Sequence, residues 1–228
     1  IGENGSGKSR LGTWMDLKSP QRNIVDRISA QRALAMPDHT TPTSLQQAQN
    51  NLLYGIENLE GSEPLWYKEN YRWGSKPAIS SLNDYGKLMV YLFSDKIEED
   101  SKYIELVKSS EKRIEPTTTK LDKIKYIWEK TLPHRELVLG GLTIQTRAKG
   151  NNEAVYNPSE MSDGERVIFY LIGQCLAAPE NGIIVIDEPE IHLHKSVQVP
   201  LWKDIEKLRP DCLFVYMTHD TDFAAALH

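Results

Sequence analysis

The sequence has few cysteines, no long apolar run and no excess of basic residues. Only two of its 228 residues are cysteines, Cys175 and Cys212, and both lie in apolar stretches. Such cysteines are more typical of reduced core residues than of a disulfide or a metal pair, so we expect an intracellular, cytoplasmic protein. No apolar run approaches the roughly 20 residues that a membrane-spanning helix requires, and no signal peptide is visible. We therefore expect no membrane contact.

The charge balance argues against one further class of protein. Aspartate and glutamate outnumber lysine and arginine, which gives a formal net charge of -5. A protein whose whole surface binds nucleic acid is normally basic, so this balance disfavours such a surface and leaves only a local DNA contact open. The length allows one large domain, or one domain with a sizeable insertion, and either can bury a core.

The chain begins with a phosphate-binding pattern. The stretch "IGENGSGKS" matches G-x-x-x-x-G-K-[ST], in which glycines let backbone N–H groups turn toward a phosphate. Lys8 would reach the β- and γ-phosphates, and the Ser9 hydroxyl would bind Mg²⁺. A helix that opens at Ser9 would direct its positive end at the same anion. The residues that we predict to bind ATP here are Gly2, Glu3, Asn4, Gly5, Ser6, Gly7, Lys8, Ser9 and Arg10.

This pattern lacks the strand that normally precedes it. The stretch "SRLGTWMDL" supplies the helix that should follow the loop, but no residues stand before Ile1 to form a strand. We therefore interpret the chain as a fragment of a longer protein. The alternative is a glycine- and serine-rich loop that matches the pattern by accident, and the other motifs of the chain argue against it.

Periodicity divides the chain into a core and an insertion. Residues 23–30 alternate and are β-branched enough for a strand, and a loop rich in proline, threonine and serine follows them. Apolar residues three and four apart then predict helices over residues 44–59, 81–99, 101–114 and 119–132. Residues 135–148 and 153–157 predict a hairpin around "KGNN", and residues 164–178 predict a buried helix. The predicted nucleotide-binding core comprises residues 1–37 and 132–228, with a helical insertion over 38–131.

Two acidic residues follow the most apolar strand of the predicted core. Residues 183–186 read "IIVI" and predict a buried parallel strand, and Asp187 and Glu188 come directly after it. Open α/β sheets bind ligands at the carboxyl ends of their strands. Asp187 would therefore hold Mg²⁺, and Glu188 would accept a proton from the water that attacks the γ-phosphate.

Two more motifs point to the same chemistry. "MSDGERVIF" places Ser162 at the start of a predicted helix, where its hydroxyl and the backbone N–H groups would face an anion. A helix cap formed by Ser162 is an equally good structural explanation, and both can hold together. "LFVYMTHD" predicts a strand that ends in Thr218, His219 and Asp220, which places a histidine at the same edge as the two acids.

The order of these motifs resembles that of ABC-type ATPase heads. A phosphate loop is followed by a signature, here "SDGE", then by a strand that ends in "DEPE" and a strand that ends in "THD". The glutamate-ended signature and "DEPEIHLH" are most similar to the soluble branch that contains the SMC, Rad50, RecF and OLD-type ATPases. Within it, "RISAQRAL", "SDGER" and "THDTDFA" resemble the anti-phage ATPases of the PARIS type, which work with a Toprim-type nuclease.

This resemblance implies a fold, cofactors and partners. The fold is an α/β P-loop NTPase, an ABC ATPase head with a mainly parallel core sheet, a flanking antiparallel segment and an inserted helical subdomain. ATP and Mg²⁺ are the implied cofactors, and the head pairs with a second copy around two nucleotides. A nuclease effector and a phage protein that acts as trigger are the implied partners. A DNA-repair or chromosome ATPase and, less so, the nucleotide-binding subunit of a transporter remain alternatives.

The resemblance also assigns roles to residues. It gives the phosphates to residues 2–9, Mg²⁺ to Asp187, the hydrolytic water to Glu188 and the γ-phosphate to His219. Gln31 falls where a glutamine contacts Mg²⁺ and the water, although it follows Lys8 closely and a solvated loop residue is an equal alternative. The signature would act on ATP bound to a second subunit through Ser162, Asp163, Gly164 and Glu165.

Four features of the sequence stay outside these assignments or depart from the family pattern. Asp163 stands where the signature usually has glycine, and Arg10 stands where the residue after "GKS" is usually small, so either could alter affinity or rate. Glu190, His192 and His194 form E-x-H-x-H, which is a weak candidate metal site because a single irregular loop rarely makes its ligands converge. The aromatic and basic cluster Trp66, Tyr67, Tyr71, Arg72 and Trp73 could stack on nucleic acid or hold a partner, but we favour its packing within the insertion's own core.

Overall fold

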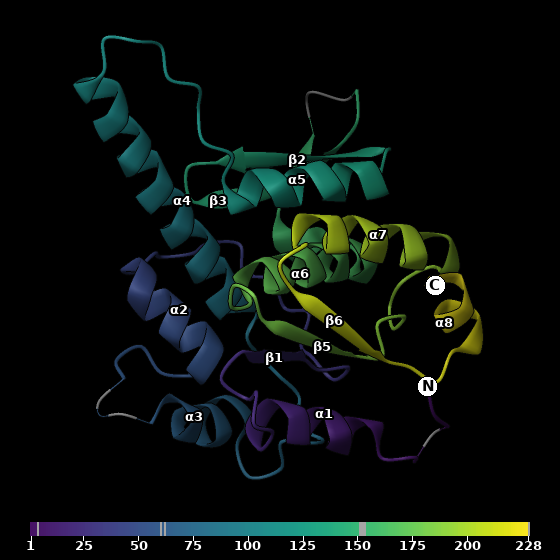
Figure 1. The fold of residues 1–228 in the computed structure, drawn as a ribbon. Coiled ribbons are helices and arrows are strands. Elements are labelled where there is room, and N and C mark those ends of the chain that lie inside the picture. The colour runs from purple at the N-terminus through teal and green to yellow at the C-terminus, as the bar shows by residue number, and fades with distance from the viewer. Residues whose placement is uncertain (4, 60, 62, 151–153, 228) are drawn as a thin grey trace.

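A parallel sheet of three strands forms the centre of the molecule (Figure 1). The computed structural model describes residues 1–3, 5–59, 61, 63–150 and 154–227. The strands β1 (Val25–Ile28), β5 (Ile183–Asp187) and β6 (Leu213–Met217) lie in the order β1-β5-β6. Ile28 pairs with Ile186, and Asp187 pairs with Met217. The carboxyl ends of all three strands therefore meet at one edge, as the sequence predicted for the two acids and the histidine.

Helices cover both faces of this sheet (Figure 1). The helix α1 (Lys8–Leu17) lies on one face, and α6 (Asp163–Ala177) and α7 (Lys195–Leu208) lie on the other, with α8 (Thr221–Leu227) beside the N-terminus. A Cβ atom on Gly12 would come within 2.4 Å of the Met217 side chain and 3.2 Å of Arg27 Cδ. Glycine at this position lets α1 approach the sheet closely, which brings the loop before α1 to the edge where the strands end.

The segment between β1 and the antiparallel strands is helical, as predicted. It contains α2 (Leu45–Tyr54), α3 (Pro64–Tyr67), a π-helical stretch (Lys68–Trp73), α4 (Tyr85–Ser109) and α5 (Lys120–Thr131). The predicted break between residues 99 and 101 is wrong, because α4 continues through it. No proline or glycine interrupts "EEDSK", and ion pairs from Lys96 to Asp100 and from Lys102 to Glu98 stabilise the helix there.

A second, antiparallel sheet lies beside α5 (Figure 1). Its strands are β2 (Arg135–Gly140), β3 (Thr143–Ala148) and β4 (Val155–Tyr156). The predicted pairing around "KGNN" is confirmed where Thr146 pairs with Tyr156, although residues 151–153 lie outside the described part of the chain. The run 135–148 is itself a hairpin rather than one strand, because Gly140 and Gly141 end the first strand and Gly140 pairs with Thr143.

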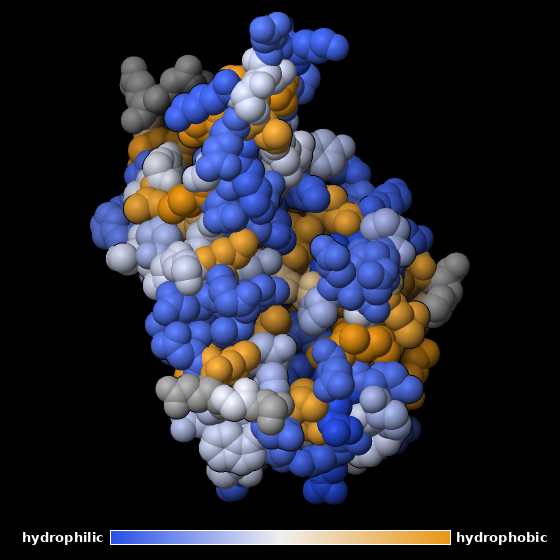
Figure 2. Space-filling view, turned by 60° about the vertical axis from the view of Figure 1, so that its left-hand side comes forward, coloured by the Kyte–Doolittle hydropathy of each residue, from blue (hydrophilic) through white to orange (hydrophobic). Residues whose placement is uncertain are grey.

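One hydrophobic core joins the helical segment to the sheet. Leu52 and Leu88 of the helical segment are fully buried in the same cluster as Phe169 of α6 and Ile184 of β5. The face over α2 and α4 is mainly hydrophilic, with small separate apolar patches (Figure 2). Among the described helices, none is long and apolar enough to cross a membrane. Many apolar side chains of the helical segment face the shared core, but Ile104 and Leu106 near the end of α4 are about half exposed.

The two cysteines are free thiols within the described structure. Cys175 is fully buried in α6, and Cys212 is partly buried before β6. Burial raises the pKa of the Cys175 thiol, so the thiolate that disulfide exchange requires is disfavoured there. Cys175 is a buried core residue, as predicted, whereas the Sγ atom of the partly buried Cys212 accepts a hydrogen bond from Arg209 Nη2 at 2.8 Å.

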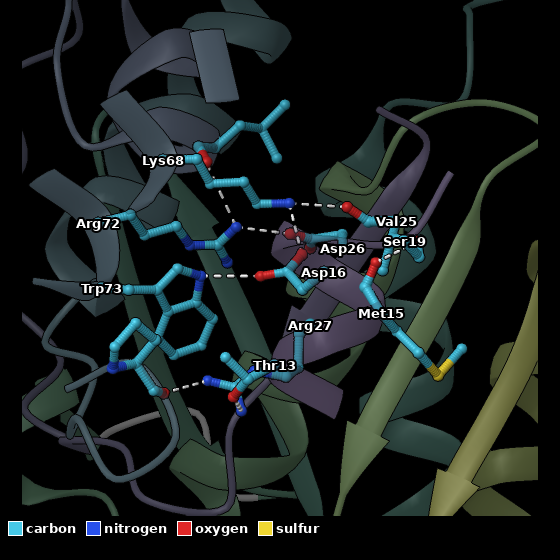
Figure 3. A network of polar contacts seen from close by, with 12 residues as sticks. Thr13, Met15, Asp16, Ser19, Val25, Asp26, Arg27, Lys68, Arg72 and Trp73 are labelled. Atoms are coloured by element: carbon cyan, nitrogen blue, oxygen red, sulfur yellow. Dashed lines mark hydrogen bonds and ion pairs between the residues drawn. The ribbon is translucent and has the colours of Figure 1, made fainter. Parts of the chain in front are cut away.

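A buried polar network ties the π-helical stretch to α1 and β1 (Figure 3). Lys68 forms an ion pair with Asp16 at 2.5 Å and donates to the Val25 carbonyl oxygen, while Arg72 pairs with Asp26 at 2.5 Å. Burial by itself lowers the pKa of Arg72, but Asp26, Asp84 and Asp16 outweigh it and raise that pKa. Breaking such a buried pair would leave an uncompensated charge, so this network fixes where the helical segment docks.

The network also divides the aromatic cluster of residues 66–73. Trp66, Tyr67 and Tyr71 contact one another, and Trp66 and Tyr71 are more than half exposed. Trp73 is buried against Leu17 of α1, and its indole N–H donates to Asp16 at 2.8 Å. The expectation that these aromatics pack in the insertion's own core therefore holds only in part for Trp73. It clusters with Leu82 of the insertion, but also contacts α1 and, through a cation–π contact with Arg27, β1.

Trp73→Phe is expected to lower the free energy of unfolding by about 1–3 kcal/mol, because it leaves a buried carboxylate oxygen of Asp16 without its donor. Urea denaturation followed by circular dichroism measures the change. Trp66→Phe is the matched control, since this tryptophan is 54% exposed, and its effect should stay within about 0.5 kcal/mol. Equal losses in both variants would contradict the role of Asp16 as the buried partner.

Candidate functional site

A cavity of about 930 Å³ opens where the phosphate loop meets the carboxyl ends of β1 and β5. Four segments line it: the loop and first turn of α1, the end of β1, a stretch of the helical segment, and the loop after β5. The lining residues of these segments are Gly5, Gly7, Lys8, Ser9 and Arg10; Ser29, Ala30, Gln31 and Arg32; Ala78, Ile79 and Ser81; and Asp187, Glu188, Ile191 and His192. Residues from both ends of the chain thus share one cavity.

The phosphate loop has the backbone shape that its glycines predict. Gly5 and Gly7 have φ angles of 82° and 90°, and open space surrounds the position of a Cβ at each. The Lys8 ammonium donates to the carbonyl oxygens of Gly2 at 2.7 Å and Glu3 at 3.0 Å. Asn4 lies outside the described residues. The loop therefore curves around its own lysine, and the helix that follows begins at Lys8, one residue earlier than predicted.

The loop is also fixed to the end of β6. The Gly2 N–H donates to the Thr218 carbonyl oxygen at 3.2 Å, and the Ser6 N–H donates to the Glu3 carbonyl oxygen. Gly2, Glu3 and Ser6 lie in the loop without lining the cavity. Of the predicted loop residues that are described, Gly5, Gly7, Lys8, Ser9 and Arg10 are the ones that face it.

Asp187 and Glu188 lie at the end of β5, as predicted, but in different environments. The Asp187 side chain is buried, and its Oδ1 atom has no hydrogen-bond partner among the described residues. Glu188 has a φ angle of 51°, and its N–H donates to the Met217 carbonyl oxygen at 2.8 Å. A left-handed backbone at a residue other than glycine costs about 1–3 kcal/mol and is concentrated at functional sites. The sharp turn carries the chain away from the sheet directly after the two acids.

His219 reaches Glu188 from the neighbouring strand. Its Nδ1 atom lies 3.5 Å from Oε1 of Glu188 and 3.5 Å from Oε1 of Glu190, and its side chain is 42% exposed. Glu190 is held by Thr218, whose hydroxyl donates to it at 2.6 Å. His219 does not line the cavity itself, but the parallel pairing of β5 with β6 places it beside the predicted base.

Gln31 and Arg10 lie at the rim of the cavity. Both are exposed cavity-lining residues, and the Gln31 carbonyl oxygen accepts a hydrogen bond from the Leu82 N–H at 3.1 Å. This bond joins the end of β1 to the helical segment. Gln31 thus lines the same cavity as Ser9, Asp187 and Glu188, and its contact with Mg²⁺ stays a prediction.

The signature does not meet this cavity. Ser162 caps α6, and Glu165 accepts hydrogen bonds from the Ser162 N–H at 2.7 Å and hydroxyl at 2.9 Å. Glu165 also pairs with Arg135 at 3.0 Å and is only 6% exposed, whereas the Asp163 side chain is 68% exposed. The predicted helix cap is confirmed. The carboxylate of Glu165 is occupied within the chain, which leaves the exposed residues Ser162 and Asp163 and the half-buried Gly164 as the accessible part of the signature.

The side chains at the cavity fit an Mg²⁺ site that is completed by substrate phosphates. They do not fit a metal site built from protein ligands alone. Among the described residues, no group of three or more His, Cys, Asp or Glu could hold a metal ion. Glu190 contacts Thr218, His192 lines the cavity, and His194 caps α7 through Ser196, so E-x-H-x-H does not converge. Mg²⁺ is usually held by one or two carboxylates together with substrate phosphates. The unpartnered Oδ1 atom of Asp187, in a cavity that Ser9 also lines, fits that pattern.

Sequence reasoning missed part of the cavity lining. Arg32 and Ser29 follow β1, and three further residues belong to the predicted insertion, yet all of them share the cavity with Lys8; the three are Ala78, Ile79 and Ser81. Arg32 pairs in a parallel β-bridge with Leu82, and the Ala33 N–H donates to the Leu82 carbonyl oxygen at 2.7 Å. In the sequence, only the position of Arg32 directly after Gln31 could have indicated that it lines the cavity. The contact with residues 78–82 joins distant parts of the chain, so no local pattern predicts it.

Comparison with known proteins gives one family. A family model described as "AAA domain, putative AbiEii toxin, Type IV TA system" matches residues 65–221, which is more than half of the chain. Among solved structures, the chain is similar to "Crystal structure of the SmcHead bound to the C-winged helix domain of ScpA", with 13% identity and a TM-score of 0.41 over 61% of this chain. The match covers 44% of that solved chain. None of the curated proteins matches the chain.

Proposed function

The chain belongs to the AAA-domain family that matches it and has the P-loop NTPase fold, and from this premise we propose that it binds and hydrolyses ATP as one head of a paired ATPase. The observation that carries the proposal is the meeting of Lys8, Ser9, Asp187 and Glu188 at one cavity. Their motifs lie at opposite ends of the sequence. A glycine-rich loop that matched by accident would have no reason to face two acids at the end of a buried strand.

Binding follows from the loop and from Asp187. The Lys8 ammonium would contact the β- and γ-phosphates, while the open, positive-φ backbone of Gly5 and Gly7 lets phosphate approach the loop. Mg²⁺ would be held by the Ser9 hydroxyl and Asp187, with Gln31 beside them. When bound, the ion would neutralise charge on the phosphates. The unpartnered Asp187 oxygen would gain the ion as its partner when Mg²⁺ binds.

Hydrolysis requires a base, and Glu188 is the group in place to act as one. Its carboxylate would take a proton from the water that attacks the terminal phosphate. The position of His219 at 3.5 Å lets its imidazole orient this carboxylate or contact the γ-phosphate. The turn at Glu188 fixes the backbone from which this side chain extends, because its N–H is bonded to β6.

Pairing of two heads follows from the place of the signature. Asp163 and Gly164 lie at the start of α6 and outside the cavity of their own chain. A helix N-terminus favours anions. A second copy would bring the N-terminus of its α6 to the phosphates bound by the first copy. Closed symmetric pairing would then complete both sites together.

We further propose that the paired state controls a partner protein, as the resemblance to anti-phage ATPases implies. The family description names a putative toxin of a toxin–antitoxin system, and this supports control of an effector rather than transport. A nuclease effector and a phage protein as trigger are the partners to test by co-expression with the parent gene's neighbours. ATP turnover that DNA stimulates, together with DNA binding that weakens as salt is added, would instead favour the DNA-repair alternative.

Gly164→Arg is expected to leave ATP affinity within about twofold of the parent and to lower turnover at least tenfold, through bulk and charge where the second head would dock. Gly164 is a cleaner position for this test than Ser162, because a Cβ on it meets no atom within 4 Å and the capping bonds of Ser162 stay in place. ATP titration measures the affinity, phosphate release measures the turnover, and light scattering measures whether the heads pair. Gly86→Arg, at an equally open position in the first turn of α4, is the matched control.

Mixing Gly164→Arg with Lys8→Ala sharpens this test. A mixed pair has one site with both changes and one site with neither, so turnover should return if one intact site is sufficient. Normal turnover by Gly164→Arg as a monomer would contradict the proposed pairing and reduce "MSDGER" to a helix cap.

A further inference from the structure

Arg32 is a buried arginine that the proposed chemistry has not used. It is only 8% exposed, yet it lines the cavity together with Lys8 and Asp187. Among the described residues, its hydrogen-bond acceptor is the Ser29 carbonyl oxygen, at 2.7 Å from Nη1. Its Nε and Nη2 atoms are buried and have no partner there. Two donors of a charged group are therefore unsatisfied beside the phosphate loop.

This arrangement is unfavourable for the chain alone. A buried guanidinium loses its hydration, and an unmade hydrogen bond at a charged group is more costly than one at a neutral group. Burial lowers the pKa of Arg32, and Tyr170, Asp84 and Asp187 partly oppose this effect. Arginine nevertheless remains protonated in proteins, so the site retains a positive charge that calls for an anionic partner.

The surroundings hold the guanidinium in place. Its carbon lies 5.7 Å from the centre of the Tyr170 ring, and the Tyr170 hydroxyl donates to Asp84 at 2.7 Å. The backbone of Arg32 is fixed by its β-bridge to Leu82. A positioned planar fork of donors matches the oxygens of a phosphate group.

The position of Arg32 selects one end of a nucleotide. Asp187 acts on Arg32 electrostatically, and its own Oδ1 atom also lacks a partner among the described residues. Asp187 and Glu188 mark the end of the cavity at which the terminal phosphate would react. An anion between Arg32 and a cation held by Asp187 would satisfy both side chains.

We propose that Arg32 binds the terminal phosphate of the nucleotide, so that the cavity distinguishes a nucleoside triphosphate from a diphosphate. The inference rests on the proposed ATP site and adds to it a residue outside the motifs that define the loop. The β-bridge to Leu82 makes the helical segment part of this contact. The Arg32 guanidinium would lose this partner again when the terminal phosphate leaves after hydrolysis.

The test compares Arg32→Met and Arg32→Lys with the parent, using ADP and the non-hydrolysable analogue β,γ-imido-ATP as probes in the presence of Mg²⁺. Calorimetric titration should show about tenfold weaker binding of the triphosphate analogue by Arg32→Met, with ADP affinity within about twofold of the parent. Arg32→Lys keeps the positive charge but lacks the planar guanidinium donors, so its loss of affinity for the triphosphate analogue should be intermediate. Arg22→Met, at an exposed arginine between α1 and β1, should change neither affinity.

Thermal unfolding without nucleotide separates this role from a structural one. Arg32→Met should melt at or above the temperature of the parent, because it replaces a buried unpaired charge by an apolar chain of similar length. A lower melting temperature together with equal losses for both nucleotides would overturn the proposal and make Arg32 a structural support. If Arg32→Met does not fold, Arg32→Lys must still lose triphosphate affinity selectively, or the proposal fails. A parent that binds neither nucleotide would overturn the proposed ATPase function itself.

Discussion

Glu188→Gln is expected to lower ATP turnover by about 10²-fold or more, as the loss of a general base does. Glutamine keeps the length of the side chain and can occupy the same turn, but its amide does not take a proton from water. The left-handed backbone at this position and its bond to Met217 are not altered by the exchange, so the fold should be retained. Phosphate release under single-turnover conditions measures the effect.

The same variant should bind ATP and keep the heads paired. Binding depends on the phosphate loop and on Asp187, which Glu188→Gln leaves in place, so light scattering with ATP should show a persistent pair. Glu180→Gln, at an exposed acid before β5, serves as the control and should turn over like the parent. If Glu188→Gln also turned over at the parental rate, the base would be another residue, and His219 at 3.5 Å would be tested next.

Lys8→Ala is expected to weaken ATP binding by at least about 10²-fold, because each charge-assisted contact to phosphate contributes about 1.5–3 kcal/mol. The fold should survive the change, since the Lys8 ammonium contacts only the carbonyl oxygens of Gly2 and Glu3 among the described residues. Titration with ATP measures the affinity, and thermal unfolding without nucleotide checks the fold.

Lys18→Ala is the matched control for this variant. Lys18 stands at the other end of α1, where it forms an exposed ion pair with Glu69 at 2.8 Å. Exposed pairs of this kind contribute about 0–1 kcal/mol to stability, and ATP affinity should not change. An unchanged ATP affinity in Lys8→Ala would remove the basis for the proposed function, and Arg32 would then have no triphosphate to distinguish.

The helical segment contacts the part of the molecule that forms the candidate site. Arg27 of β1 donates to the Ser9 carbonyl oxygen at 3.2 Å and to the Pro77 carbonyl oxygen at 2.5 Å. Ala78, Ile79 and Ser81 line the cavity, and Leu82 pairs with Arg32, the residue after Gln31. The predicted boundaries of the insertion, residues 38–131, remain a proposal, but its side chains are part of the site and of the shared core.

The sequence by itself determined the local elements and the chemistry of the motifs. Four consecutive apolar residues predicted the buried strand β5, and the glycines of residues 2–7 predicted a loop with positive φ angles, because both depend on neighbours in the chain. Ser162 predicted the cap of α6, since the capping bonds join residues only three apart. The order of the motifs was sufficient to predict the α/β class and the candidate residues.

Only the tertiary structure decided which of these residues meet. The sequence predicted His219 at the same sheet edge as Glu188, but only the order β1-β5-β6 makes the two strands neighbours and brings the side chains within 3.5 Å, and no local pattern contains strand order. The buried partner of Trp73 lies in α1, and the bridge from Arg32 to Leu82 carries residues 78–81 to the phosphate loop. Periodicity and propensity act over one or two turns of chain, whereas burial and the unpaired donors of Arg32 arise from packing between segments that the sequence keeps far apart.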